Sequence, residues 1–352
     1  MQELLSLPRI PRGGLIWQVT MFSLAASAVV VFAAAVTVLA SPSSTVGMRV
    51  RDGRILEADG HDLVIRGINH SYLWHADRRQ VFADIKATGA NTVRVALAGG
   101  EVWPATPKGQ VKAIVAQCRL HRLICVLDIH DTMGWGQEPG AATLGQAVDS
   151  WLRLRSVLFG AERYVILNIG NEPAGYHVTT TWSADTVSAV RRLRDAGFKH
   201  LLMVDAPDWG ADETHTMSDN AAALLAADPA HNIAFSIHMY GPYNTWQKVE
   251  DYLTSYTRRR LAVVVGEFAA THPYGDPDED AIMSICSTTR TGYLGWSWSG
   301  NDTQNHTLDM VNDFDPRHLT PWGERFINGP DGIRATSTEA ATFSDPSGTD
   351  PR

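Results

Sequence analysis

The sequence predicts a single α/β domain folded as a (β/α)₈ TIM barrel, and three observations support this prediction. Eight apolar, strand-like runs follow one another along the chain. Most of the gaps between them carry a helical pattern, and strands that alternate with helices form parallel βαβ units. A chain of 352 residues is long enough for eight such units to close into one barrel.

The predicted strands are apolar runs short enough to be buried. They are Leu63–Asn69, Asn91–Leu97, Leu123–Asp131, Tyr164–Glu172, His200–Pro207, Ile233–Tyr240, Leu261–Phe268 and Gly292–Ser299. An open doubly wound sheet is the alternative architecture, but no G-x-G-x-x-G motif follows the first strand.

Helical patterns occupy several of the gaps between these runs. They include residues 77–89, 183–197, 246–260 and 278–290. Gly89 suits the C-terminal end of the first helix, because glycine readily adopts the left-handed conformation that often ends a helix. Ser183 is predicted to be the N-cap of the second helix.

An apolar N-terminal stretch precedes the barrel. Arg9 and Arg12 lead into an uncharged segment from Leu15 to Ala40 that ends in small residues, as a secretory signal does. The segment is also long enough to cross a bilayer, which takes about 20 apolar residues. We therefore expect residues 1–45 to be a signal peptide or a membrane anchor, and the protein to be secreted or anchored in the cell envelope.

The remaining chain divides into the barrel, residues 46–334, and a C-terminal tail, residues 335–352. The tail is rich in Ser, Thr, Asp, Pro and Gly and has no apolar period, which predicts disorder. The net charge of −8 and the lack of a basic block argue against a nucleic-acid partner.

The chain contains three cysteines, Cys118, Cys125 and Cys286. They form no CxxC pair, which argues against a zinc ribbon or a thioredoxin-like site. At most one disulfide can form, and the sequence leaves open whether any two of them pair. Cys286 lies in a helical pattern and is expected to be a buried thiol.

Two of the predicted strands end in a glutamate. The run Tyr164–Pro173 finishes with Asn171-Glu172-Pro173, and Leu261–Phe268 carries Glu267 near its end. Proline cannot donate to a sheet ladder, so the first of these strands stops at the glutamate. The carboxyl ends of the strands are where a parallel barrel has its active site.

Other polar and aromatic side chains collect at the same strand ends. They are Asn69, His70, Arg94, His130, Asp131, Asn171, Asp205, His238, Tyr240, Trp296, Trp298 and Asn301. Arg94 lies inside an apolar run, and a buried guanidinium is costly without an anionic partner. A carboxylate at the barrel mouth is the expected partner.

Two carboxylates in one site indicate glycoside hydrolysis, in which one is a protonated acid and the other an ionised nucleophile or base. Arg94 and the Tyr240 hydroxyl are expected to keep Glu267 ionised, whereas Glu172, in a less cationic setting, keeps its proton. A metal site made by His130, His238 and Glu267 is the competing interpretation. No HExxH or similar ligand spacing supports it.

These residues resemble the motifs of glycoside hydrolase family 5, a family of retaining (β/α)₈ hydrolases, and in particular its bacterial endo-β-1,4-mannanases. The resemblance covers roughly residues 48–333 and rests on 89–95, 164–173, 196–207, 235–240, 276–280 and 295–301. It implies that Glu172 is the acid/base and Glu267 the nucleophile, with no metal and no cofactor. The substrate-binding residues that it implies are Arg94, His130, Asn171, His238, Tyr240 and Trp296. Trp298 is grouped with them, with packing as its alternative role.

Three loops depart from the family pattern and leave the sugar preference open. They are Ser71–His75, Ala269-Ala270 and Gly99–Pro107, which contains Trp103. We expect an endo-β-1,4-mannanase acting on mannan, galactomannan or glucomannan. The alternatives are an endo-β-1,4-glucanase and a catalytically weak carbohydrate-binding barrel. The expected partner is a β-1,4-linked polysaccharide, with membrane contact only through the N-terminal segment, and the protein is expected to be a monomer.

Overall fold

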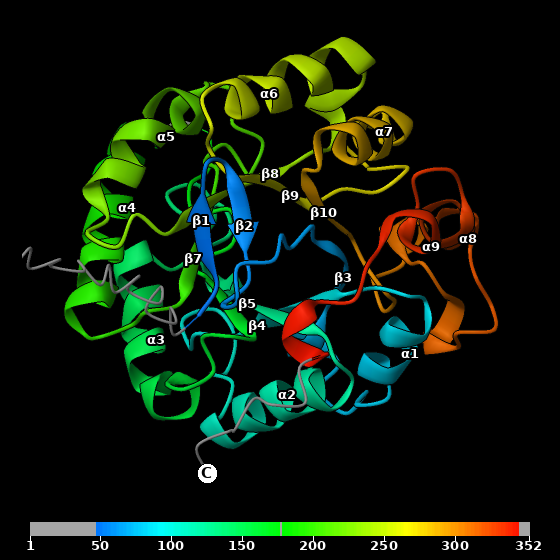
Figure 1. Cartoon of the computed structure of the whole chain (residues 1–352), viewed down its shortest axis with the longest axis horizontal. Coiled ribbons are helices and arrows are strands. Elements are labelled where there is room, and N and C mark those ends of the chain that lie inside the picture. The colour runs from blue at the N-terminus through cyan, green and yellow to red at the C-terminus, as the bar shows by residue number, and fades with distance from the viewer. Residues whose placement is uncertain (1–46, 177, 345–352) are drawn as a thin grey trace, which may run out of the picture. The chain divides into compact units, whose positions relative to one another are not determined.

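A closed barrel of parallel strands forms the centre of the molecule, inside a ring of helices (Figure 1). The computed structural model describes residues 47–176 and 178–344. The strands follow the order β10-β3-β4-β5-β6-β7-β8-β9 around the barrel. They are β3 (Arg66–His70), β4 (Thr92–Leu97), β5 (Ile124–Ile129), β6 (Val165–Asn168), β7 (Leu201–Asp205), β8 (Ile233–His238), β9 (Val263–Glu267) and β10 (Gly292–Gly295). The predicted (β/α)₈ fold is confirmed, and each of the eight runs supplies one strand.

The helices pack around the outside of this barrel. They are α1 (Val81–Ala87), α2 (Lys108–Leu120), α3 (Leu144–Leu158), α4 (Thr179–Asp195), α5 (Thr216–Ala227), α6 (Trp246–Arg258), α7 (Glu279–Thr289), α8 (Pro321–Asn328) and α9 (Ile333–Thr336). The prediction that Ser183 caps α4 is wrong, because the N-cap position is Val178 and Ser183 lies inside the helix. Trp182, only 1% exposed, stabilises the additional first turn by packing on the core.

Two apolar layers result from the alternation of side chains along the strands. In β5, Ile124 and Val126 point into the barrel, whereas Cys125 and Leu127 point outward to the helices. All three cysteines are buried free thiols, and Cys286 lies on α7 as the sequence predicts.

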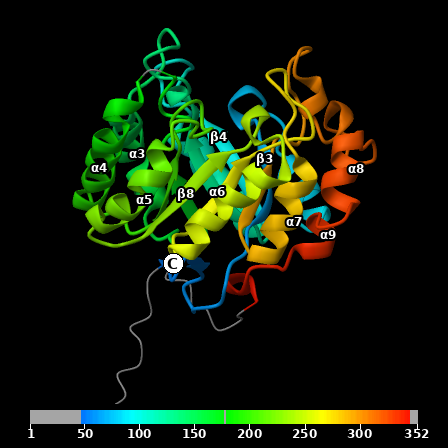
Figure 2. The same cartoon turned by 90° about the horizontal axis from the view of Figure 1, so that it is seen from above.

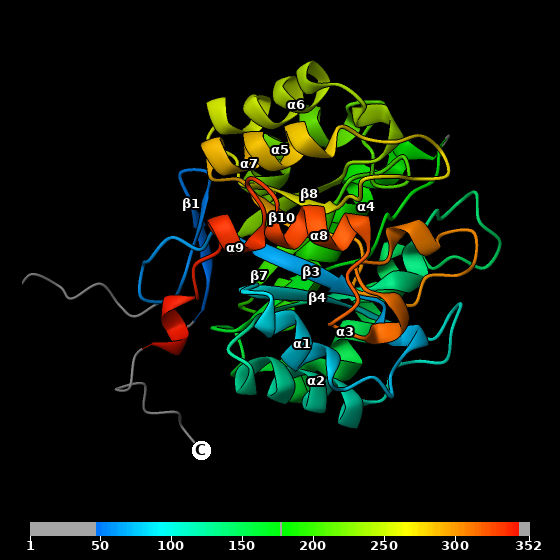
Figure 3. The same cartoon turned by 90° about the vertical axis from the view of Figure 1, so that its right-hand side faces the viewer.

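A two-stranded hairpin covers the N-terminal end of the barrel. Its strands, β1 (Arg49–Arg51) and β2 (Arg54–Leu56), are antiparallel and are joined by Asp52-Gly53. Both turn residues have positive φ, 51° and 77°, as the tightest hairpin turns require. Figures 2 and 3 show the hairpin at one end of the barrel and the long βα loops at the other.

Residues 335–344 are ordered, so the prediction of a disordered tail from residue 335 is wrong for these ten residues. Glu339 pairs with Lys86 at 2.8 Å and Arg122 at 2.6 Å. The Glu57 carboxylate accepts hydrogen bonds from the backbone N–H groups of residues 341 and 342. Ion pairs and hydrogen bonds between a carboxylate and backbone N–H groups hold this segment. Such contacts need no periodic apolar residues, so the hydrophobic pattern of the sequence does not reveal them.

The expected signal or anchor, residues 1–45, lies outside the described residues, as do residues 345–352. Among the residues that the structure describes, none of the helices combines the length and apolar character needed to cross a bilayer. Residues 47–62 and 333–344 form the end of the barrel that is opposite to the strand exits (Figure 3).

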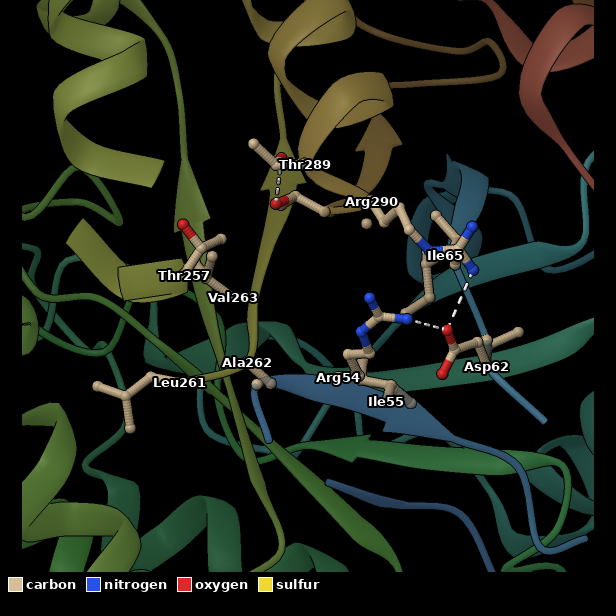
Figure 4. Close-up of a pocket in the computed structure, with 15 residues that line it drawn as sticks. Arg54, Ile55, Asp62, Ile65, Thr257, Leu261, Ala262, Val263, Thr289 and Arg290 are labelled. Atoms are coloured by element: carbon tan, nitrogen blue, oxygen red, sulfur yellow. Dashed lines mark hydrogen bonds and ion pairs between the residues drawn. The ribbon is translucent and has the colours of Figure 1, made fainter. Parts of the chain in front are cut away.

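A small cavity lies beneath the hairpin at this same end (Figure 4). Arg54 and Arg290 both bond to the Asp62 carboxylate at its rim. Its volume of about 40 Å³ is far below the roughly 300 Å³ at which ligand pockets begin. The cavity is therefore too small for a sugar.

Candidate active site

The two glutamates predicted to be catalytic lie together at the barrel mouth. Glu267 is the last residue of β9, and Glu172 lies in the loop that follows β6. They are buried, with 5% and 7% of their surface exposed, respectively. One carboxyl oxygen of each and one ring nitrogen of His238 all lie within 4.8 Å of one another.

A bulge in β9 sets the position of Glu267. Ile237 pairs with Val265, but His238 pairs with Glu267, so Gly266 is the extra residue. A Cβ atom on Gly266 would lie 2.2 Å from Ser236 Oγ, so only glycine fits at this position. The bulge places the Glu267 carboxylate beside the His238 ring.

The backbone of Glu172 adopts a left-handed conformation, with φ of 42°. Its carbonyl oxygen accepts hydrogen bonds from the N–H groups of Gly134 at 3.0 Å and Ala174 at 2.9 Å. These bonds from two loops hold the unusual backbone in place, and such strain is typical of functional residues.

Two donors hold the Glu267 carboxylate. Arg94 Nη1 donates to Oε1 at 2.7 Å, and the Tyr240 hydroxyl donates to Oε2 at 3.0 Å. Both oxygens are thereby fixed, and the carboxylate is aimed rather than free to rotate.

Arg94 is fully buried and is itself held by a ring of polar side chains from neighbouring strands. Its hydrogen-bond acceptors besides Glu267 are Asn168 at 2.9 Å, Asn69 at 3.0 Å, Asn171 at 2.6 Å and Asp205 at 3.4 Å. Asp128 lies 3.6 Å away. Although burial opposes the charge, the surrounding carboxylates raise the pKa of Arg94 above its ordinary value. The buried guanidinium therefore has the anionic partners that the sequence requires of it.

His238 links the two glutamates to Asp205. Its Nδ1 lies 2.7 Å from Glu172 Oε1 and 3.6 Å from Glu267 Oε2, and its Nε2 lies 3.4 Å from Asp205 Oδ2. Burial alone would lower the pKa of His238, but the Glu267 and Asp205 charges outweigh it and raise the pKa to about 10. The pKa of Asp205 falls to about 2, because His238 and Arg94 outweigh its burial. The surrounding carboxylates therefore favour the protonated, imidazolium form of the ring.

This cation changes the electrostatics that the sequence predicts. Burial raises the pKa of Glu267, and the charges on His238 and Arg94 oppose that rise. Glu172 does not lie in a less cationic setting, because it bonds directly to the His238 ring. Each glutamate thus contacts a positive charge. The two differ in their hydrogen-bond partners, because the Glu267 carboxylate accepts from Arg94 and Tyr240, whereas the Glu172 carboxyl group bonds to His238.

Trp296 and His130 form an aromatic wall beside the glutamates. Their rings stack with centroids 5.7 Å apart and an interplanar angle of 21°. Trp296 Nε1 donates to Asn301 Oδ1 at 3.0 Å, and His130 Nδ1 bonds to Asp128 at 2.9 Å. Both rings are thus fixed at one edge by a hydrogen bond.

Trp298 does not belong to this wall. It is 1% exposed and packs in the apolar layer between strands and helices. Its backbone N–H donates to the carbonyl oxygen of Asn69 at 2.9 Å. Trp296 is 8% exposed, so the burial of Trp298 favours packing, the alternative role given to it, over substrate binding.

Two of the loops that depart from the family pattern meet beside His130. Trp74 contacts Trp103 edge to face with centroids 5.4 Å apart, and it contacts His130 at the same distance and in the same way. Trp74 is 44% exposed. These two loops extend the aromatic surface from Trp296 outward along the β3 and β4 side of the barrel.

A sequence model of the family described as cellulase (glycosyl hydrolase family 5) matches residues 56–302, which contain all of these residues. The chain belongs to glycoside hydrolase family 5. A mannan endo-1,4-beta-mannosidase of Streptomyces lividans is 49% identical over 84% of this chain and 78% of its own length. A protein of the same name from Cellvibrio japonicus is 45% identical over 87% of this chain and 71% of its own length.

Solved structures of beta-mannanases match the barrel as well. The mannohexaose complex of the Thermomonospora fusca beta-mannanase is 47% identical and covers 84% of this chain and 99% of its own, with a TM-score of 0.82. The beta-mannanase of Streptomyces thermolilacinus is 46% identical over 84% of this chain and 99% of its own, with a TM-score of 0.83.

Sequence reasoning missed two members of this family 5 site, Asn168 and Asp128. Both lie inside apolar strands, and their Cα positions pair across β5 and β6. Asn168 bonds to Arg94 Nε, and Asp128 bonds to His130. A single polar residue on the inward face of an apolar strand was the available signal, because nothing but another polar group can satisfy it there.

The metal alternative is not supported by the chemistry of this family 5 site. Within the described part of the chain, the groups close enough to share an ion are Glu172, His238 and Glu267, and His130 is not among them. Their facing atoms already bond to one another or to Arg94. The fixed positive charge of Arg94, 2.7 Å from Glu267, would repel a cation bound there.

Proposed function

We propose that this chain is an endo-β-1,4-mannanase that cleaves internal bonds of mannan, galactomannan and glucomannan with retention of configuration. The observation that carries the proposal is the pair of buried glutamates with oxygens within 4.8 Å. Inverting enzymes hold their carboxyl groups about 6.5–9.5 Å apart to admit a water, whereas retaining enzymes hold them about 5–5.5 Å apart. The pair here leaves no room for that water.

The choice of mannan is supported by the relatives. The Streptomyces lividans and Cellvibrio japonicus proteins are named mannan endo-1,4-beta-mannosidase, and the Thermomonospora fusca structure contains mannohexaose. A Caldicellulosiruptor saccharolyticus protein that is 42% identical over 309 residues is named beta-mannanase/endoglucanase A. That double name makes β-1,4-glucan the second candidate substrate.

In the first step, Glu267 attacks the anomeric carbon and the bond from that carbon to the leaving oxygen breaks. Glu172 gives its proton to this oxygen. Before this step the proton is shared between Glu172 Oε1 and His238 Nδ1, which lie 2.7 Å apart, so the His238 ring is neutral once Glu172 has passed the proton on. In the second step, Glu172 takes a proton from water, the water oxygen bonds to the anomeric carbon, and Glu267 leaves as a carboxylate.

The remaining side chains orient the reacting groups. Arg94 and Tyr240 fix the two oxygens of Glu267 so that one of them faces the sugar. Asn171 accepts from Arg94 through Oδ1, which leaves its amide nitrogen for a substrate hydroxyl. Trp296, with His130 stacked on it, is the platform under the reacting sugar.

We also propose that the enzyme works outside the cytoplasm as a monomer. The basic and apolar composition of residues 1–45 supports export, either as a cleaved signal or as an anchor that is the chain's one contact with a membrane. Mannan is an extracellular polymer, so the substrate and the export signal agree.

The test is hydrolysis by the purified protein from residue 41 onward. We expect it to release reducing sugars from galactomannan and glucomannan, with much lower rates on carboxymethylcellulose. Proton NMR of the first product should show the β-anomer. Glu267→Ala, which removes the nucleophile, is the matched control for contaminating hydrolases. A first product of α configuration, or activity on cellulose alone, would contradict the proposal.

A further inference from the structure

The loop that follows β9, the third that departs from the family pattern, contacts the active site through His272. It begins with Ala269-Ala270 and leads to α7. The His272 ring is half-buried and stacks on the ring of Tyr240, with centroids 4.2 Å apart and an interplanar angle of 27°. Tyr240 is the residue whose hydroxyl donates to Glu267 Oε2. A single side chain therefore separates His272 from the nucleophile.

The orientation of the Tyr240 ring depends on its side-chain contacts. β8 ends at His238, two residues earlier, and Tyr240 lies at the start of the short 3₁₀ turn Gly241–Tyr243. The hydroxyl bonds to Glu267 at one edge of the ring, and His272 covers one face. A ring held at both places keeps its hydroxyl on the carboxylate.

A closed turn holds His272 in place. Its backbone N–H donates to Asp276 Oδ1 at 2.9 Å, and its carbonyl oxygen accepts from the N–H of Gly275 at 2.9 Å. Its ring Nδ1 accepts from the backbone N–H of Tyr274 at 3.3 Å. Gly275 has a φ of 117°, which side chains other than glycine rarely allow. These bonds fix both the backbone and the ring of His272.

The same turn packs against the backbone that follows Tyr240. A Cβ atom on Gly241 would lie 2.5 Å from the carbonyl oxygen of Tyr274, so the two loops meet backbone to backbone. Before the turn, the Thr271 hydroxyl donates to the Thr307 hydroxyl at 3.0 Å, in the loop after β10. The stack of His272 on Tyr240 is therefore built on fixed backbone from both sides.

His272 faces Tyr240 as a neutral ring. Because Nδ1 accepts a hydrogen bond, the ring proton lies on Nε2. Burial lowers the pKa of His272, although the charges on Glu267 and Asp276 oppose this change. A neutral ring adds no charge beside the nucleophile. Its effect on Glu267 must therefore pass through the position of Tyr240.

We propose that His272 is a positioning residue, whose ring holds the Tyr240 hydroxyl on the nucleophile. This inference rests on the proposed function, because Glu267 is a nucleophile only in a chain that cleaves glycosidic bonds. Without the stack, the Tyr240 ring is free to turn, and the carboxylate retains its bond to Arg94 while losing its second donor. Fewer molecules then hold Glu267 aimed at the sugar, so kcat falls while KM is unchanged.

The test compares kcat and KM on mannotetraose for two replacements of His272. His272→Asn keeps a side-chain acceptor for the Tyr274 N–H and loses the ring, whereas His272→Phe keeps a ring and loses the acceptor. His272→Asn should lower kcat about fivefold, the rate equivalent of one aromatic pair. Its KM should stay within about twofold of wild type. His272→Phe should retain most of the wild-type kcat.

A double-mutant cycle with Tyr240→Phe tests whether His272 acts through the hydroxyl. In the Tyr240→Phe background, His272→Asn should change kcat less than about 1.5-fold, because the group that it positions is gone. The matched control is His318→Asn, which removes an imidazole with 66% of its side chain exposed, and it should leave kcat unchanged in both backgrounds. Asp276→Ala removes the acceptor of the His272 backbone N–H. It should show the same dependence on Tyr240, and it replaces His272→Asn if that variant does not fold.

The outcomes separate this inference from the proposed function. The positioning role is refuted if His272→Asn lowers kcat by the same factor in both backgrounds, or if His272→Phe loses as much as His272→Asn. Wild-type kcat in both His272→Asn and Asp276→Ala would refute it too, as would a raised KM at unchanged kcat, which indicates a contact with substrate. If wild type cleaves no mannan, the proposed function itself has failed, and this inference with it.

Discussion

Replacing Tyr240 by Phe removes one hydroxyl and leaves the ring where it is. The hydroxyl donates to Glu267 Oε2 at 3.0 Å, and the ring stacks on His272 with centroids 4.2 Å apart. The variant therefore isolates a single hydrogen bond to the nucleophile. The other oxygen of Glu267 keeps its bond to Arg94 at 2.7 Å.

The magnitude follows from the charge on the acceptor. Hydrogen bonds to charged groups contribute about 1.5–3 kcal/mol. If that bond is used to aim Glu267 at the sugar, its loss lowers kcat/KM about 10- to 150-fold. Because the donor favours the ionised carboxylate, its removal raises the pKa of Glu267, so the acidic limb of the pH profile should move to higher pH.

The assay is kcat/KM on mannotetraose across pH, with the melting temperature measured in parallel. Tyr243→Phe is the matched control, since its hydroxyl donates to the carbonyl oxygen of Ala211 at 2.8 Å and not to a glutamate. It should cost about 1 kcal/mol of unfolding free energy and leave the pH profile unchanged. Wild-type kcat/KM for Tyr240→Phe, or an unshifted acidic limb, would refute the reasoning.

Four further predictions concern the proton, the sugar platform, the cation and the N-terminus. Glu172→Ala should form the glycosyl-enzyme on an aryl glycoside and then stall, and added azide should release the sugar as the β-glycosyl azide. Glu267→Ala should form no glycosyl-enzyme, and azide should give only the α-glycosyl azide. The opposite products would show that the two glutamates have exchanged roles. Trp296→Ala should lower kcat/KM about tenfold or more and leave the melting temperature near that of wild type. Trp298→Ala should lower the melting temperature, and a loss of kcat/KM without a loss of melting temperature in this variant would contradict the assignment. Since the pKa of His238 is raised from 6.5 to about 10, its stabilising contribution is complete below pH 6.5 and is lost as the pH rises toward 10. The urea midpoint of wild type should therefore fall over that range more than that of His238→Gln, and parallel curves would exclude this cause. Deleting residues 1–40 should leave a soluble, active enzyme, and an insoluble product would argue that the segment packs on the barrel.

The strands and the two glutamates could be predicted because their physical causes are local. A buried parallel strand must be continuously apolar, and the chain must become polar where that strand reaches the barrel mouth. Glu172 and Glu267 both follow this rule. Their roles came from a resemblance to family 5, since local sequence does not say which carboxylate faces which partner.

The parts that failed depend on contacts between distant segments. The imidazolium state of His238 requires Asp205 and both glutamates around one ring, and no sequence window contains all four. Trp298 has the same local pattern as Trp296, and only the packing at the last strand exit decides that Trp296 keeps 8% of its surface exposed and Trp298 1%.

The ends of the described chain bear on how the enzyme could be attached to other materials. The amide of Met48 bonds to the Glu162 carbonyl oxygen at 3.1 Å, and Thr342 is fixed on Glu57, so both ends are fastened to the base of the barrel. A support or a fused module joined before Gly47 or after Ser344 would leave the opposite face clear. An immobilised form coupled through either end should therefore still digest insoluble fibres, whereas grafts into the βα loops would obstruct the path of the polymer.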